Sequence, residues 1–78
     1  MAVTGYVLIQ TEVGKAAGVA GAVRELQGVT SADDVTGPYD VIVRIEAPTL
    51  DDLGKQVASQ IQAVEGISRT FTCLVVNL

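Results

Sequence analysis

Few side chains in this sequence have the chemistry that catalysis requires. Enzymes use a nucleophile beside a base, a poised acid–base pair or a metal ion, and this chain has no histidine and one cysteine. The cysteine, Cys73, lies in the apolar run Phe71–Val75, where we expect a buried and unreactive thiol. The pairs Asp33–Asp34 and Asp51–Asp52 are adjacent in sequence, so on a strand or helix their carboxylates point in different directions. The sequence therefore predicts that the protein is not an enzyme.

One turn, Gly37–Asp40, has a composition suited to binding a small molecule. Glycine and proline bend the backbone, and such a bend can direct amide N–H groups outward to hold an anion. Tyr39 adds an aromatic wall, and the carboxylate of Asp40 can hold an ammonium group. A zwitterionic amino acid requires this combination of groups. The other interpretation is an ordinary tight turn in which the aspartate only stabilises the bend, and the residues alone leave both interpretations open.

The composition excludes several other partners. The net charge is −4 and the pI is near 4.4, whereas a nucleic-acid-binding surface needs a basic stripe. The N-terminal residues lack the pattern of a signal peptide, and no apolar run approaches the roughly 20 residues that span a bilayer. The glycines match no phosphate-binding loop, and one cysteine without histidine provides no metal site. We expect a cytoplasmic protein with no cofactor, no metal, and no direct contact with nucleic acid or membrane.

Apolar periodicity and turn residues divide the chain into two strand–helix–strand units. In the second unit, Thr49 is placed to cap a helix. The apolar stripe of that helix is Leu50, Leu53, Val57, Ile61 and Val64. The expected elements are a strand over Val3–Thr11, a helix over Ala16–Gln27, a strand over Val29–Thr36, a turn at Gly37–Asp40, a strand over Val41–Ile45, a helix from Pro48 to Gly66 and a strand over Ser68–Leu78.

A repeat relates the two units. When the sequence is shifted by 38 positions, Val3 falls on Val41 and Gln27–Thr30 falls on Glu65–Ser68. Two right-handed strand–helix–strand crossovers predict an α+β fold, a ferredoxin-like βαββαβ sandwich. Its four-stranded antiparallel sheet has the first and third strands in the middle and both helices on one face. We expect a single domain over residues 1–78.

The repeat also leaves one face of the sheet uncovered. The side chains expected under the helices are Val3, Val7, Ile9, Val41, Val43 and Ile45. A monomer would expose the apolar residues of the other face, which monomeric proteins usually avoid, and a chain this short buries only about 60–65% of its surface. We expect a second copy to cover that face; the alternative is a set of ordinary half-exposed residues. The predicted dimer-interface residues are Tyr6, Leu8, Ile42 and Arg44.

Two runs of residues resemble the effector-binding (RAM) domain of the Lrp/AsnC family of transcriptional regulators. The turn Gly37–Asp40 has the order G-x-Y-D, and Gly66–Thr72 has the order G-I-x-R-T-x-T, with a leucine-patterned helix between them. The likeness covers nearly the whole chain. It implies a stand-alone form of the domain, without the helix-turn-helix that precedes it in family members.

The resemblance also implies a function. Family members pair through their sheets and assemble the dimers into rings, often octamers, and an amino acid or similar effector binds between dimers. The matching positions for ligand binding are Gly37, Tyr39, Asp40, Thr70 and Thr72. A stand-alone domain of this type can modulate full-length Lrp/AsnC regulators by co-assembly.

Two other functions are compatible with the residues. One is a purely structural homo-oligomer, whose turn packs between dimers without a ligand. The other is a small enzyme of the dimeric α+β barrel type, which usually places a histidine or a polar cleft between sheet and helices. The expected apolar rows of the two helices would fill that space instead.

Overall fold

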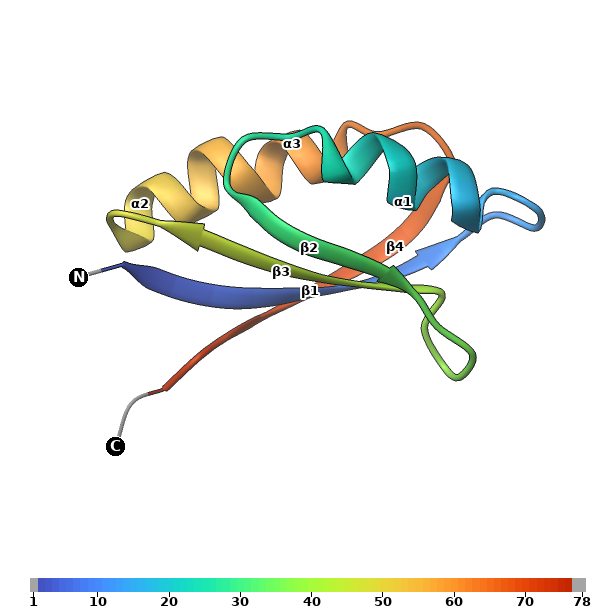
Figure 1. Ribbon diagram of the computed structural model, residues 1–78, viewed down its shortest axis with the longest axis horizontal. Helices are drawn as coiled ribbons and strands as arrows, with labels where there is room; N and C mark the ends of the chain where they lie inside the picture. The colour runs from blue at the N-terminus through green and yellow to red at the C-terminus, as the bar shows by residue number, and fades with distance from the viewer. Residues whose placement is uncertain (1, 77–78) are drawn as a thin grey trace.

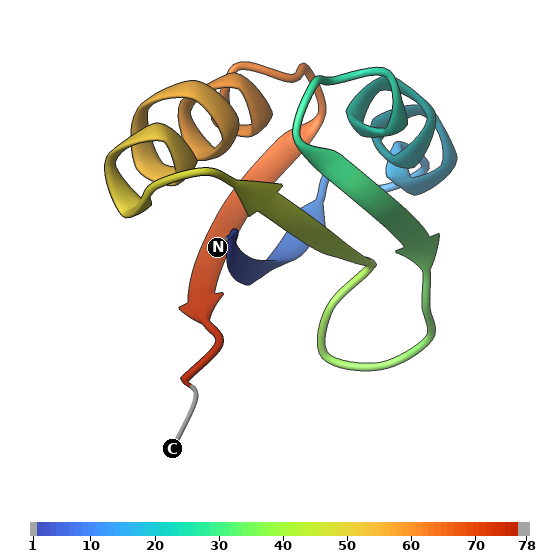
Figure 2. The ribbon, with the colours of Figure 1, turned by 60° about the vertical axis from the view of Figure 1, so that its left-hand side comes forward.

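The computed structural model describes residues 2–76, which form one sheet with helices on a single face (Figure 1). The strand order is β2-β3-β1-β4, and every neighbouring pair is antiparallel. The helices lie next to each other over the sheet, and the described residues place no helix on its other face (Figure 2). The elements are β1 (Val3–Thr11), α1 (Ala16–Arg24), β2 (Val29–Asp34), β3 (Val41–Ala47), α2 (Leu50–Asp52), the π-helix η1 (Leu53–Ala58), α3 (Ser59–Gln62) and β4 (Ile67–Leu74). The predicted ferredoxin-like fold is confirmed.

Several elements are shorter than the periodicity predicts. The first helix, α1, ends at Arg24 rather than Gln27. Its last turn tightens because the amide of Leu26 donates to the carbonyl of Val23, three residues earlier, at 3.0 Å. Strands β2 and β4 also end before their predicted C-terminal residues. The predicted end of the last strand, Leu78, lies outside the described residues.

The hydrophobic core fills the layer between the sheet and the helices. Alternate residues of the two central strands are buried against the helices, as predicted. Val3 lies at the margin and is only partly buried. The fully covered strand residues are Val7, Ile9, Val41, Val43 and Ile45, and the helix residues packed on them are Val19, Ala20, Val23, Leu53, Val57 and Ile61.

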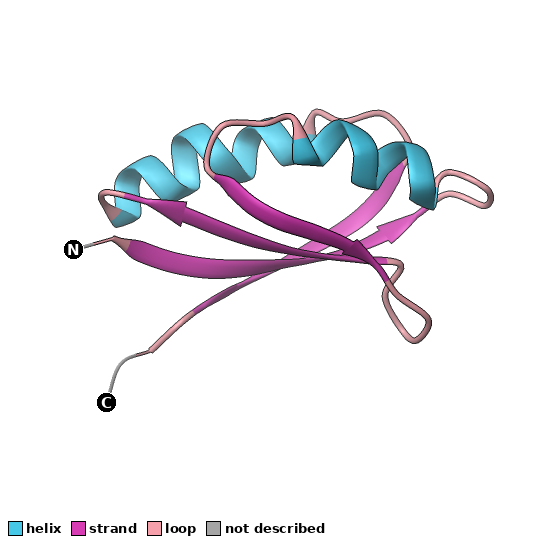
Figure 3. Cartoon of the chain, in the orientation of Figure 1, coloured by secondary structure: helices cyan, strands magenta, loops and turns pink. Residues whose placement is uncertain are grey.

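The segments α2, η1 and α3 form one continuous helix, called here the second helix (Figure 3). Its cap is the predicted one, because the hydroxyl of Thr49 accepts a hydrogen bond from the amide of Asp52 at 3.1 Å. Its buried residues, Leu53, Val57 and Ile61, are spaced by four. An α-helix repeats every 3.6 residues, so a spacing of four drifts around its surface. The wider i→i+5 turn of η1 keeps these residues on one face.

The internal repeat is present in the structure, but its two parts have different offsets. Ala32 of β2 pairs with Val43, and Thr70 of β4 pairs with Ile9. Thr70 is therefore 38 residues after Ala32, whereas Val43 is only 34 residues after Ile9. The predicted equivalence of Val3 with Val41 is wrong by four residues. Because four is an even number, the faces of the strands were still assigned correctly.

The difference of four residues is one added helical turn. The first helix begins at Ala16, whose counterpart at an offset of 38 is Gly54, but the second helix begins earlier, at Leu50. Leu50 lies in this added turn and is 57% exposed. The predicted apolar stripe is therefore wrong at Leu50, because this turn has no counterpart in the first unit.

Each unit also contains a β-bulge at the same place. The pairing skips Thr30 of β2, between Val29 and Ser31, and Ser68 of β4, where Ile67 and Arg69 pair with Thr11 and Gln10. The hydroxyl of Thr30 donates to the carbonyl of Arg44 at 3.1 Å. Its counterpart, Ser68, donates to the carbonyl of Gln10 at 3.1 Å. These hydroxyls satisfy carbonyls of the central strands where the ladder is interrupted.

Two glycines turn the chain from each helix into the following edge strand. Gly28 has φ +91° and Gly66 has φ +98°, a left-handed conformation that residues with a Cβ atom adopt at a cost. A Cβ atom on Gly28 would lie 2.6 Å from Cγ2 of Val57 and 3.2 Å from the carbonyl oxygen of Glu46. Both the backbone and the packing therefore require glycine at this corner.

We expect Gly28→Ala to lower the free energy of unfolding by about 1–3 kcal/mol, because it combines left-handed strain with a clash against buried Val57. Gly18→Ala is the matched control. It lies within α1 with nothing within 4 Å of an added Cβ, and we expect it to stabilise the protein by roughly 0.5–1 kcal/mol. Urea denaturation of both variants measures the difference. Equal free energies of unfolding for the two variants would contradict the strain and the clash described for Gly28.

Candidate functional site

The turn Gly37–Asp40 is tied to the end of the central strand β1. The carboxylate oxygen Oδ2 of Asp40 accepts hydrogen bonds from the amide of Thr11 at 2.8 Å and from its hydroxyl at 3.2 Å. The amide of Asp40 donates to the carbonyl of Ile9 at 2.9 Å. One carboxylate oxygen and the amide of Asp40 thus hold the turn in place, which leaves Oδ1 for another partner. Asp40 has the role of a turn anchor, one of the two interpretations that the sequence allowed.

The rest of the turn contacts the ends of β1 and β4. The side-chain amide of Gln10 donates to the carbonyl of Pro38 at 3.1 Å. The rings of Tyr39 and Phe71 meet edge to face, with 6.0 Å between their centroids. The guanidinium carbon of Arg69 lies 5.1 Å from the centroid of Phe71. The turn therefore ends in a small cluster of two aromatic rings and one cation.

The two threonines of the predicted ligand site lie on the other side of the sheet from this cluster. Thr70 pairs with Ile9 and Thr72 pairs with Val7, and both partners face the helices. Phe71, between them, faces away from the helices. Within one copy, Tyr39 and Asp40 are thus brought together, whereas Thr70 and Thr72 form a separate pair at the β4 edge. Gly37 is exposed at the tip of the turn.

The sheet face without helices, called here the open face, carries the predicted dimer residues in neighbouring positions. Tyr6 lies opposite Arg44 and Leu8 lies opposite Ile42 in the β1–β3 ladder. Tyr6 is 39% exposed, and Leu8 and Ile42 are half-buried. The four residues form one patch, apolar except for Arg44.

Arg44 already has a partner of its own chain. Its guanidinium lies 3.4 Å from the carboxylate of Glu46 on the same face of β3. Both side chains are largely exposed, so this ion pair contributes little to stability. The positive charge of Arg44 is therefore partly balanced within its own chain.

Cys73 also lies on the open face, opposite Tyr6. Its thiol is free and exposed, so the predicted burial is wrong. The apolar run around Cys73 belongs to an edge strand whose alternate residues point away from the core, and a run of apolar letters does not reveal which face of a strand is covered.

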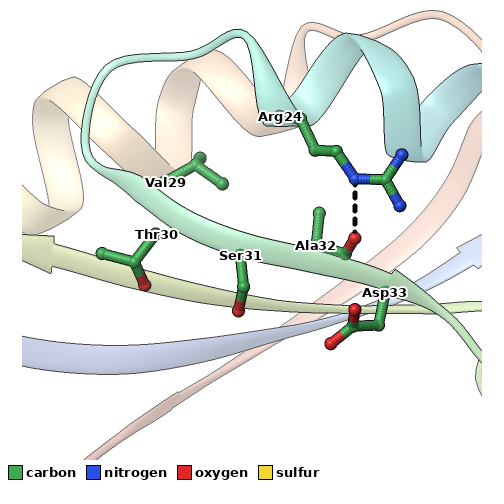
Figure 4. A pocket seen from close by; sticks show the side chains of 6 residues that line it. All are labelled: Arg24, Val29, Thr30, Ser31, Ala32 and Asp33. Atoms are coloured by element: carbon green, nitrogen blue, oxygen red, sulfur yellow. Dashed lines mark hydrogen bonds between the residues drawn. The ribbon is translucent and has the colours of Figure 1, made fainter.

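A depression of about 350 Å³ lies along the outer edge of β2, lined by Arg24, Val29, Thr30, Ser31, Ala32 and Asp33. In Figure 4 the side chain of Ala32 points toward α1, whereas Ser31 and Asp33 point to the opposite side of the strand. Arg24 donates from Nε to the carbonyl of Ala32 at 2.9 Å. This bond occupies one of the outward-facing carbonyls and thereby protects an edge strand from pairing with other chains.

Three residues of the turn cluster escaped the sequence-based prediction: Gln10, Arg69 and Phe71. The positions of Phe71 and Arg69 on β4 would have predicted on which face of the sheet they lie. Phe71 lies opposite Leu8 and Arg69 lies opposite Gln10, so both belong to the open face. That Phe71 also reaches Tyr39 of the turn depends on the β1–β4 register, which connects residues about 60 positions apart.

The described residues offer few other sites. No group of three or more His, Cys, Asp or Glu side chains among residues 2–76 is placed to hold a metal ion. In the same part of the chain, each helix is too short or too polar to cross a membrane.

Comparison with known proteins identifies the family. The model of the Lrp/AsnC ligand binding domain matches residues 4–77. A solved structure from Thermus thermophilus is 30% identical with a TM-score of 0.88, and the match covers 97% of this chain and 95% of that one. A hypothetical protein from Pyrococcus horikoshii is 32% identical with a TM-score of 0.87, covering 97% of this chain and 92% of that one.

More distant matches come from longer proteins. A transcriptional regulator of Neisseria meningitidis, solved as a complex with L-Met, shares the fold at 17% identity with a TM-score of 0.79; the match covers 96% of this chain and 50% of the regulator. The homocitrate synthase of Sulfurisphaera tokodaii is 37% identical over 52 residues, which are 67% of this chain and 11% of the enzyme. The chain thus spans only a small part of this curated relative. By the family match over residues 4–77, this chain belongs to the Lrp/AsnC ligand-binding domains, which are regulatory effector-binding domains.

Proposed function

We propose that this domain pairs with a second copy through its open face, assembles further into a ring such as an octamer, and binds an amino acid or similar small molecule between dimers. In this role it modulates full-length regulators of the Lrp/AsnC type by co-assembly. The observation that carries the proposal is the family match over residues 4–77. The protein acts as a binding and assembly module, which recognises its ligand and its partners by non-covalent contacts.

The open face supports the pairing step. Leu8, Ile42 and Phe71 form an apolar row across three strands, and Phe71 alone is 41% exposed. Covering such a row with the same row of another copy removes apolar surface from water on both sides, at roughly 25 cal/mol per Å². Arg44 lies beside this row, opposite Tyr6, so the row itself is apolar with polar groups next to it, an arrangement typical of a protein–protein interface.

The turn supports the binding step. The proposed ligand residues are Gly37, Tyr39 and Asp40, with Thr70 and Thr72. Within one copy they lie in two groups on opposite sides of the sheet edge, so a site that uses both groups needs a second copy to supply one of them. A site between dimers meets this requirement. The complex of the Neisseria regulator with L-Met favours an amino acid as the ligand.

The ligand is tested by thermal denaturation with each of the twenty amino acids at millimolar concentration. We expect at least one to raise the melting temperature by roughly 5–10 °C at ten times its dissociation constant, because a ligand stabilises the state that binds it. No response to any of them would contradict amino-acid binding and favour the purely structural homo-oligomer.

A pair of variants locates the site. Asp40→Asn keeps an oxygen that can accept the hydrogen bond from Thr11, so the fold is retained, but it loses the charge for a ligand ammonium group. We expect it to lose the response to the active amino acid. Asp34→Asn, an equal charge change at the exposed end of β2, is the control and keeps the response. An unchanged response in Asp40→Asn would place the ligand elsewhere.

The dimer is tested by sedimentation velocity at micromolar concentration. We expect Ile42→Glu to shift the protein toward a monomer, because it places a charge in the centre of the apolar row. Gln62→Glu, which adds the same charge to an exposed position of the second helix, should leave the assembly unchanged. A monomeric wild-type protein would overturn the pairing step, and circular dichroism shows whether Ile42→Glu remains folded.

The likeness to homocitrate synthase favours a second candidate function, in which a domain of this type regulates a biosynthetic enzyme. The two candidates differ in the partner. A regulator partner predicts that the added domain changes the DNA affinity of a full-length Lrp/AsnC protein of the same organism in a gel-shift assay. An enzyme partner predicts no such change and an altered response of the synthase to its effector.

A further inference from the structure

We propose that the open faces pair about a twofold axis parallel to the strands, so that Asp33 of each copy forms an ion pair with Arg69 of the other. The inference rests on the proposed sheet-to-sheet dimer and adds its orientation and the charged residues that select it. The open face is covered by a second copy of this chain.

One row of residues crosses the whole open face. Asp33 pairs with Ile42, Ile42 with Leu8, and Leu8 with Phe71. Directly opposite residues in a sheet project to the same side, so the row has a carboxylate at the β2 edge, two aliphatic residues in the middle and an aromatic ring at the β4 edge. Figure 4 shows the side chain of Asp33 pointing away from α1, toward this face.

Arg69 brings a positive charge to the other end of the same row. Its backbone lies opposite Gln10, two residues away from Phe71 along β4, but its guanidinium carbon is 5.1 Å from the centroid of Phe71. The cation therefore sits at the β4 end of the row and the carboxylate of Asp33 at the β2 end. β4 contains no acidic residue and β2 contains no basic one.

When the strands of the two copies share a common direction, two face-to-face arrangements have twofold symmetry. An axis parallel to the strands places β2 of one copy over β4 of the other and keeps the row aligned, so Asp33 faces Arg69. An axis across the strands places β2 over β2 and β4 over β4, so Asp33 faces Asp33 and Arg69 faces Arg69. The apolar centre, Leu8 with Ile42, is covered in both arrangements. The charges at the ends decide between them, because facing like charges destabilise a complex.

The other charges near this face do not change the result. Arg44 is balanced by Glu46 of its own strand at 3.4 Å. Arg24 lies on the helix side of β2, where its Nε is bonded to the carbonyl of Ala32. Face-to-face sheets are separated by about 10 Å, a gap that an aspartate and an arginine together can span. Two such ion pairs form in each dimer.

The test is a charge swap followed by sedimentation equilibrium at low salt. We expect Asp33→Arg and Arg69→Asp, each alone, to raise the dissociation constant of the dimer roughly tenfold. The double variant Asp33→Arg/Arg69→Asp restores the attraction and should return to within about threefold of the wild type. Glu25→Arg, an equal charge change at the exposed C-terminal end of α1, is the control and should have no effect.

The outcomes separate this inference from the proposed function. A wild-type monomer would overturn both the dimer and its orientation. A dimer whose dissociation constant is unchanged by either single variant would overturn the orientation alone. With the axis across the strands, each single variant only replaces one pair of facing like charges by another. Weakening by both single variants without recovery in the double variant would also overturn the direct pairing of Asp33 with Arg69.

Discussion

Val7 of β1 lies opposite Val43 of β3, and the antiparallel register that this pair represents governs the rest of the molecule. It places every second residue of both strands under the helices and the residues between them on the open face. If β1 shifted by one residue against β3, Tyr6 would turn under the helices and Val7 would turn to the open face, while β3 kept Val43 buried. The core and the proposed dimer surface are thus the two faces of one ladder. Because side chains alternate along a strand, a substitution in β1 or β3 affects the core at every second position and the open face at the positions between.

The internal repeat makes the two units structurally similar. The proposed dimer contacts use the residues at which the two units differ. Both units have a left-handed glycine after the helix and a hydroxyl-bearing bulge in the next strand. They differ in charge, since β2 ends in Asp33 and Asp34 whereas β4 has Arg69 in the corresponding region. A symmetric sheet with oppositely charged edges is suited to pairing with itself in a defined direction.

Asp40 anchors its turn and, in the proposed function, also binds the ligand. Its Oδ2 holds the amide of Thr11, which fixes the turn against the end of β1 and limits the entropy that the turn would lose on binding a ligand. Its second oxygen remains available to an effector. The aromatic contact between Tyr39 and Phe71 joins this turn to the open face, so the proposed ligand site and the proposed dimer surface are neighbours.

The sequence by itself determined the alternation of the central strands, the cap at Thr49, the glycine corners at Gly28 and Gly66, and the order of the elements. These features are local: each depends on residues within one or two turns of the chain. The tertiary structure alone decided the exposure of Cys73, the bond between Asp40 and Thr11 and the contact of Tyr39 with Phe71. The two contacts join residues about 30 positions apart, and the register that creates them comes from the packing of whole elements, which local periodicity does not encode.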